Sequence, residues 1–84
     1  MRAIVTNVTQ VAEILRGRRK ARRIPQQRLA GKLGISQSRL SAIEAGTSAL
    51  TVERLIVLAN VLDLQLVLQD KGDTSSKRRP QPDW

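Results

Sequence analysis

Residues 26–44, QQRLAGKLGISQSRLSAIE, restrict the fold of this chain more than any other stretch. The apolar positions fall on one helical face in each half: Leu29, Ala30 and Leu33 in the first, Leu40 and Ile43 in the second. Gly34 provides a stop for the first segment, and Ser36 is a good N-cap for the next, with Ile35 filling the turn between them. The stretch therefore predicts two short helices joined by a tight turn.

The outward side chains of the second predicted helix are short, and most can form hydrogen bonds: Gln37, Ser38, Ser41 and Ala42. A helix exposed only to water would more often carry Glu and Lys at such positions. Short polar side chains suit a helix that lies against base edges in the major groove of DNA. The pattern favours a DNA-recognition helix.

The charge of the chain is unevenly distributed. Fifteen Lys and Arg against seven Asp and Glu give a formal net charge of +8. No acidic residue lies between Glu13 and Glu44, and the basic residues of that interval are Arg16, Arg18, Arg19, Lys20, Arg22, Arg23, Arg28, Lys32 and Arg39. A solvated charged surface would explain such a segment, but the interval also contains the two short helices. This coincidence favours a nucleic-acid partner.

The composition also excludes several classes of function. The chain has no Cys, His or Tyr, so it has no disulfide framework and no thiolate or imidazole metal site. Ser and carboxylates occur without a base beside them, and we expect no enzyme and no cofactor. The N-terminus does not resemble a signal peptide, and the apolar stretch 55–68 is too short to span a bilayer. We expect a cytoplasmic protein, associated with the nucleoid through DNA and without membrane contact.

Residues from about 7 to 70 resemble the helix-turn-helix family of the lambda and 434 phage repressors, in particular its branch of HipB-type antitoxins. The matching residues are Arg19, Gln26, Leu29, Ala30, Gly34, Ile35, Leu40, Ile43, Glu44 and Gly46, followed by the apolar helix after Thr51. The branch is suggested by the apolar segment 64–68 and by a polar tail that ends in Trp84. One departure is Pro25, which stands where the family has a Ser or Thr cap.

The resemblance and the residue pattern together predict an all-α, lambda-repressor-like domain of four to five helices over residues 1–70. We expect helices over about 7–22, 25–33, 37–45 and 51–62, with Asn7 and Gln10 forming a capping box and Gly46 ending the third helix. A short C-terminal strand is expected over 65–69, and 3–5 could form another. Residues 71–84 are expected to form a disordered basic tail.

A lone strand is unstable in water, so the segment 65–69 needs a partner. We expect it to pair with the same segment of a second subunit; pairing with residues 3–5 of its own chain is the alternative. The residues assigned to this dimerisation are Ile56, Val57, Val61, Leu66 and Leu68. Two such subunits would meet half-sites about 34 Å apart, which implies a palindromic operator on double-stranded DNA.

The resemblance implies specific roles for the polar residues. Gln37 corresponds to the glutamine that binds adenine, and Ser38, Ser41 and Ala42 complete the base-contacting set, with Ala42 facing a thymine methyl group. Phosphate contacts, or contacts with an ambiguous target, are implied for Gln26, Arg28, Lys32, Ser36, Arg39, Thr47 and Ser48. The counterparts of Arg19 and Glu44 form a structural ion pair between the first helix and the recognition helix.

The predicted function is a sequence-specific transcriptional repressor that acts as the antitoxin of a type II toxin–antitoxin system. It would repress its own operon and neutralise a HipA-like serine/threonine kinase toxin. Three alternatives stay open: a stand-alone phage-type regulator, a sequence-neutral nucleic-acid binder and a purely protein-binding module. In the tail, Trp84 is either an anchor for the toxin or incidental, and Lys77, Arg78 and Arg79 could instead contact phosphates.

Overall fold

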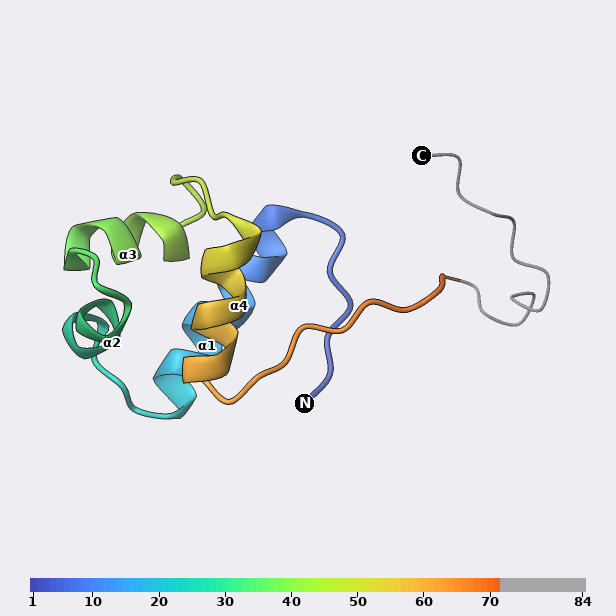
Figure 1. The fold of residues 1–84 in the computed structure, drawn as a ribbon, viewed down its shortest axis with the longest axis horizontal. Helices are drawn as coiled ribbons and strands as arrows, with labels where there is room; N and C mark the ends of the chain where they lie inside the picture. The colour runs from blue at the N-terminus through green and yellow to red at the C-terminus, as the bar shows by residue number, and fades with distance from the viewer. Residues whose placement is uncertain (72–84) are drawn as a thin grey trace.

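The computed structural model describes residues 1–71, and this part of the chain contains four helices (Figure 1). They are α1 (Val8–Ala21), α2 (Gln26–Leu33), α3 (Gln37–Glu44) and α4 (Val52–Val61). All four predicted helices are confirmed, each within about one residue of the expected ends. The predictions for the tail beyond Lys71, including those for Trp84, lie outside the described residues.

Local hydrogen bonds determine where most of these helices begin. The side-chain oxygens of Asn7, Ser36 and Thr51 each accept a backbone N–H three residues further on, at 2.9, 3.0 and 3.1 Å. The predicted capping box is modified, because Gln10 Oε1 accepts the N–H of Thr6 at 2.6 Å rather than that of Asn7. Helix α2 follows Pro25 without a side-chain cap, as the sequence implied.

All four helices contribute to one hydrophobic core. Its buried members are Leu15, Leu29, Ala30, Leu40, Ile43, Leu58 and Leu62. The apolar positions predicted for α2 and α3 therefore face inward, with Leu33 only partly buried. In Figure 1, α2 and α3 form one end of the helical body, and both terminal segments leave from the opposite side.

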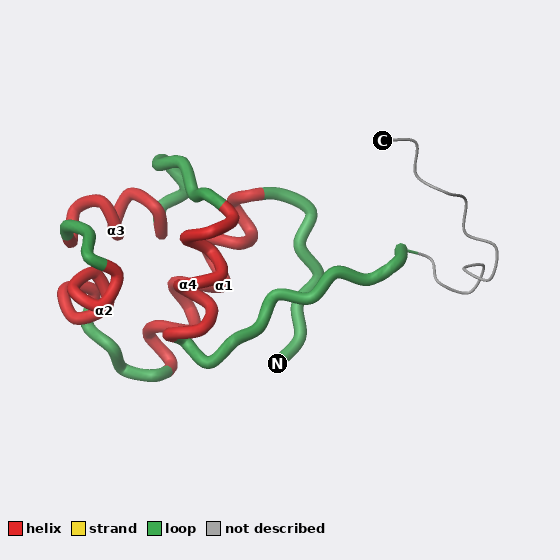
Figure 2. The backbone as a smooth tube through the Cα atoms, in the orientation of Figure 1, coloured by secondary structure: helices red, strands yellow, loops and turns green. Residues whose placement is uncertain are grey.

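The terminal segments are extended, but the expected strands do not form within residues 1–71 of this single chain (Figure 2). A side-chain hydrogen bond joins them, from Arg2 Nη2 to Gln69 Oε1 at 2.8 Å. No backbone ladder joins residues 3–5 to 65–69, so the alternative of intrachain pairing is wrong here. Without a ladder, the extended segments leave Leu68 93% exposed.

The outer face of α4 is less apolar than the sequence suggested. Ile56 and Val57 are exposed as expected, but Val61 is partly buried against the core. The difference arises because Val61 lies in the last turn, where the chain folds back and Leu64 also packs against the core. Among residues 1–71, no helix is long and apolar enough to cross a membrane.

Candidate nucleic-acid interface

Helix α3 is fixed to the core by one face and exposes the other. Leu40 and Ile43 are buried, whereas Gln37, Ser38 and Ser41 are exposed. Ala42, the fourth residue assigned to base contacts, is half-buried. The structure thus brings the four side chains onto one short helix whose outer surface is polar and free of acidic groups.

The turn before α3 fixes its direction relative to α2. Gly34 adopts the left-handed conformation with φ of 70°, which L side chains rarely adopt. The next amide, of Ile35, donates to the Ala30 carbonyl at 3.1 Å, and the Ile35 side chain packs against the core. The two helices are held by a closed turn instead of a flexible linker.

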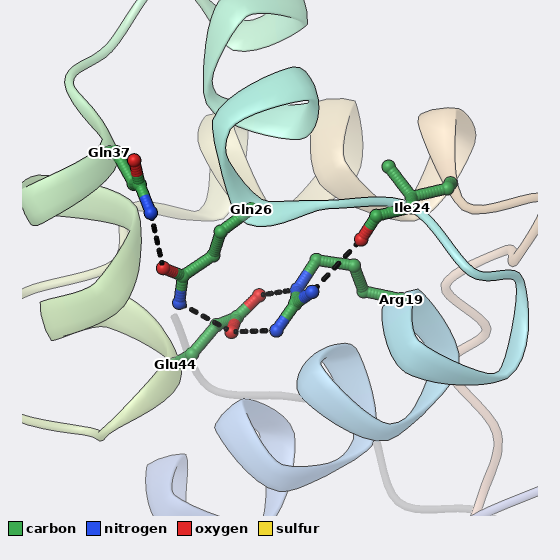
Figure 3. Close-up of polar contacts among 5 residues, drawn as sticks. All are labelled: Arg19, Ile24, Gln26, Gln37 and Glu44. Carbon is green, nitrogen blue, oxygen red and sulfur yellow. Dashed lines mark hydrogen bonds and ion pairs between the residues drawn. The ribbon is translucent and has the colours of Figure 1, made fainter.

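A buried ion pair ties α1 to the C-terminal end of α3. Arg19 Nε donates to Glu44 Oε2 at 2.7 Å, and Arg19 Nη2 donates to Glu44 Oε1 at 3.0 Å (Figure 3). Arg19 Nη1 also donates to the Ile24 carbonyl at 2.9 Å, which holds the loop before α2. The side chains are only 10% and 4% exposed, so removing either partner would leave a buried, unpaired charge.

Gln26 links this ion pair to the start of α3. This bridging role of Gln26 was not predicted from the sequence. Its Nε2 donates to Glu44 Oε1 at 3.1 Å, while its Oε1 accepts from Gln37 Nε2 at 3.3 Å (Figure 3). The resemblance had implied only a phosphate contact for Gln26. A signal was present in the sequence, since an amide opens each of α2 and α3, but the proximity of the two amides depends on how the helices pack.

The residues assigned to phosphate contacts fall into two groups. Arg28, Lys32 and Arg39 are exposed cations. The other members already have local contacts or are half-buried: Ser36 caps α3, Thr47 Oγ1 donates to the Ala42 carbonyl at 3.2 Å, and Ser48 is half-buried. These bonds leave each hydroxyl with further hydrogen-bonding capacity. The cap at Ser36 is confirmed as predicted, whereas the bond from Thr47 to the Ala42 carbonyl was not indicated by the sequence.

Part of the basic interval has a structural role at the end of α4. Arg18 Nε donates to the Leu62 carbonyl at 3.1 Å, and Arg18 Nη2 donates to that of Asp63 at 3.5 Å. Arg22 lies 3.6 Å from the Asp63 carboxylate. Arg18 thus satisfies carbonyls at a helix C-terminus, where cations are favoured, and Arg22 pairs with the carboxylate next to them. The charge available to a nucleic acid is therefore smaller than the count in the sequence suggests.

Residues 15–69 match the family model described as helix-turn-helix. The chain is 36% identical over 61 residues to an uncharacterised HTH-type transcriptional regulator, y4dL, of Sinorhizobium fredii (strain NBRC 101917 / NGR234). That match covers 73% of this chain and 31% of the relative. The chain spans less than two thirds of the length of the curated relatives it matches.

Two solved structures that contain HipB have the same fold. One is a HipB–O2 20mer complex, with a TM-score of 0.73, 26% identity, and coverage of 83% of this chain and 97% of that one. The other is a HipA–HipB–O2–O3 complex, with a TM-score of 0.72, 26% identity, and coverage of 82% and 97%. In both structures the similarity extends over nearly all of the matched chain.

Proposed function

This chain belongs to the helix-turn-helix family of DNA-binding, non-enzymatic regulators, and we propose that it is a sequence-specific repressor that acts as an antitoxin. One observation carries the DNA-binding part. Helix α3 is held by its buried face and by the Arg19–Glu44 pair, and it exposes Gln37, Ser38 and Ser41 without an acidic neighbour on that face. A rigid helix with short polar side chains is suited to base edges in the major groove.

The proposed contacts divide into two kinds. Gln37 donates to adenine N7 and accepts from N6, Ser38 and Ser41 bond to nearby edges, and Ala42 contacts a thymine methyl group. The exposed cations Arg28, Lys32 and Arg39 neutralise phosphates, and Gln26, Ser36, Thr47 and Ser48 contribute where their local bonds permit. Base contacts would determine sequence preference, and phosphate contacts would determine position and affinity.

Binding to randomised duplex DNA tests this proposal. The purified full chain should select a palindromic sequence, and it should bind that sequence ~10³-fold or more tightly than random DNA at physiological salt. A sequence-neutral binder would show the same affinity for all duplexes and a steep dependence on salt. That result would contradict the proposed base contacts.

We propose that the active species is a homodimer. Ile56, Val57, Leu66 and Leu68 are 44%, 45%, 47% and 93% exposed, which is a large apolar surface for a small domain. Pairing of the extended segment 65–69 with that of a second copy would supply the missing backbone partners and cover these side chains. Val61 would contribute less, because it already packs against the core.

The toxin part of the proposal is supported by the similarity to HipB in a HipA–HipB complex. A HipA-like serine/threonine kinase is the proposed partner, with Trp84 as an anchor and the operon's own promoter as the target. The name of the matched relative, a transcriptional regulator, favours the second candidate, a regulator without a toxin. Co-purification from the native host separates them: a bound kinase supports the antitoxin, and recovery of DNA without a protein partner supports the stand-alone regulator.

A further inference from the structure

Glu44 and Gln26 form a continuous path of hydrogen bonds from the buried ion pair to Gln37 (Figure 3). We propose that Glu44 is a positioning residue for base recognition. Its carboxylate fixes which end of the Gln26 amide faces Gln37, and this in turn fixes which groups of Gln37 face DNA. The inference rests on the proposed function of Gln37 as the residue that contacts adenine.

The first step follows from the chemistry of a carboxylate, which can only accept hydrogen bonds. Glu44 Oε1 receives Arg19 Nη2 at 3.0 Å and Gln26 Nε2 at 3.1 Å. Glu44 is 5% exposed, so little water is available to compensate for a reversed amide. Gln26 must therefore turn its NH₂ group to Glu44 and its carbonyl oxygen away from it.

The second step transfers this polarity to Gln37. The carbonyl oxygen of Gln26 can only accept, and it receives Gln37 Nε2 at 3.3 Å. One N–H of Gln37 is used in this bond, which leaves the other N–H and Oε1 available. A donor beside an acceptor is the pattern that adenine requires at N7 and N6. A reversed Gln37 amide would place two carbonyl oxygens against each other.

The charge of Glu44, and not only its shape, maintains these orientations of the Gln26 and Gln37 amides. In Glu44→Gln, one terminal atom becomes a donor, and Arg19 can offer it only further donors. The new NH₂ group can then face Gln26, which would have to reverse, and Gln37 would reverse after it. The two amides can then adopt either orientation, whereas the carboxylate permits only one. The preference for adenine at that base pair should therefore decrease.

Selection from randomised duplexes by the full chain tests the proposal with four variants. Gln37→Ala identifies the base pair that Gln37 contacts. Glu44→Gln changes the polarity, and Gln26→Met interrupts the path while leaving the Arg19–Glu44 pair intact. Ile43→Val is the matched control, because it loosens the buried core beside Glu44 without touching the path.

We expect the wild type to prefer adenine at the Gln37-dependent base pair by ~10-fold or more. Glu44→Gln and Gln26→Met should each reduce that preference several-fold and retain the preferences at other base pairs, even if overall affinity falls. Ile43→Val should lower the melting temperature and leave the preference unchanged. In the Gln37→Ala background, Glu44→Gln should cause no additional change at that base pair.

Three results would overturn the inference. If Gln37→Ala alters one base pair but Gln26→Met leaves its preference intact, Gln37 contacts the base without help from Glu44, and the proposed function stands. If Gln37→Ala alters no base pair, the proposed role of Gln37 and this inference both fail. If Glu44→Gln folds and keeps the adenine preference, the charge of Glu44 does not set the amide polarity and the inference fails; if Glu44→Gln does not fold, Gln26→Met still tests the path.

Discussion

At the scale of single residues, Arg19 and Glu44 are the buried charged side chains among residues 1–71. Their bidentate contact brings the first helix and the end of α3 together across 25 positions of sequence. The resemblance suggested this pair from two residue types alone. Spacing could not have suggested the Gln26 bridge, because that contact depends on side-chain directions at the junction of three elements.

Substitution of Glu44 by Ala should lower the free energy of unfolding by about 3 kcal/mol, because Arg19 would remain buried without its partner. For a domain of this size the melting temperature should fall by more than about 10 °C. Glu13→Ala is the control, since it removes an equal charge from an exposed site on α1. Equal melting temperatures for the two variants would show that the ion pair does not stabilise the fold.

Gln37 and Lys32 should differ in how their loss affects DNA binding. Gln37→Ala should cost ~1 to 3 kcal/mol at the selected sequence and little on random DNA, because only base contacts are lost. Lys32→Ala should weaken binding to all sequences alike and reduce the salt slope by about one. Titrations of both variants at several salt concentrations provide the test. The same behaviour for both would argue against α3 as the recognition helix.

At the scale of elements, the helices could be predicted because their signals are local. Ser36 and Thr51 act within three residues of their own position, and Gly34 ends α2 through its own φ of 70°. The segment 65–69 could not be assigned in the same way. A strand requires a ladder from elsewhere, and no such partner lies within the described part of this chain.

Two glycines in different elements should respond oppositely to substitution by Ala. Gly17 lies within α1, and a Cβ there would meet nothing within 4 Å, so Gly17→Ala should stabilise the fold by ~0.5 to 1 kcal/mol. Gly34→Ala also meets no steric contact but would force φ of 70° on an L side chain. It should destabilise by ~1 to 2 kcal/mol. Denaturant unfolding of both variants measures the difference, and a gain at position 34 would contradict the role of the turn.

At the scale of the whole molecule, the exposed apolar surface is the feature that one chain does not explain. Ile56 and Val57 on α4 and Leu66 and Leu68 on the extended segment are all more than 40% exposed. The sequence identified these side chains as unusual for a surface. Their geometric relation to a second copy could not be predicted, because it depends on contacts outside the chain.

Leu68→Asp should weaken dimerisation by ~100-fold or more, because each dimer would lose two apolar contacts of ~1.5 kcal/mol or more. The change should not disturb the monomer, since Leu68 is 93% exposed. Val52→Asp is the matched control: it places the same charge on an exposed apolar position in the first turn of α4, where an acid is favourable. Sedimentation at several concentrations measures both, and an unchanged mass distribution for Leu68→Asp would argue against the proposed interface.

Consecutive residues of α1 hold two different helices. Arg19 is bonded to the end of α3, and Arg18 is bonded to the carbonyls where the chain leaves α4. In the proposed dimer, the distance between the two recognition helices would therefore be set by stiff structure and not by a compliant hinge. An operator with one base pair added between its half-sites would have to twist or bend to fit. The DNA, and not the protein, would then have to deform to accommodate a new half-site spacing. Promoters with the wrong spacing would bind weakly because of this deformation energy, even when every contacted base matches.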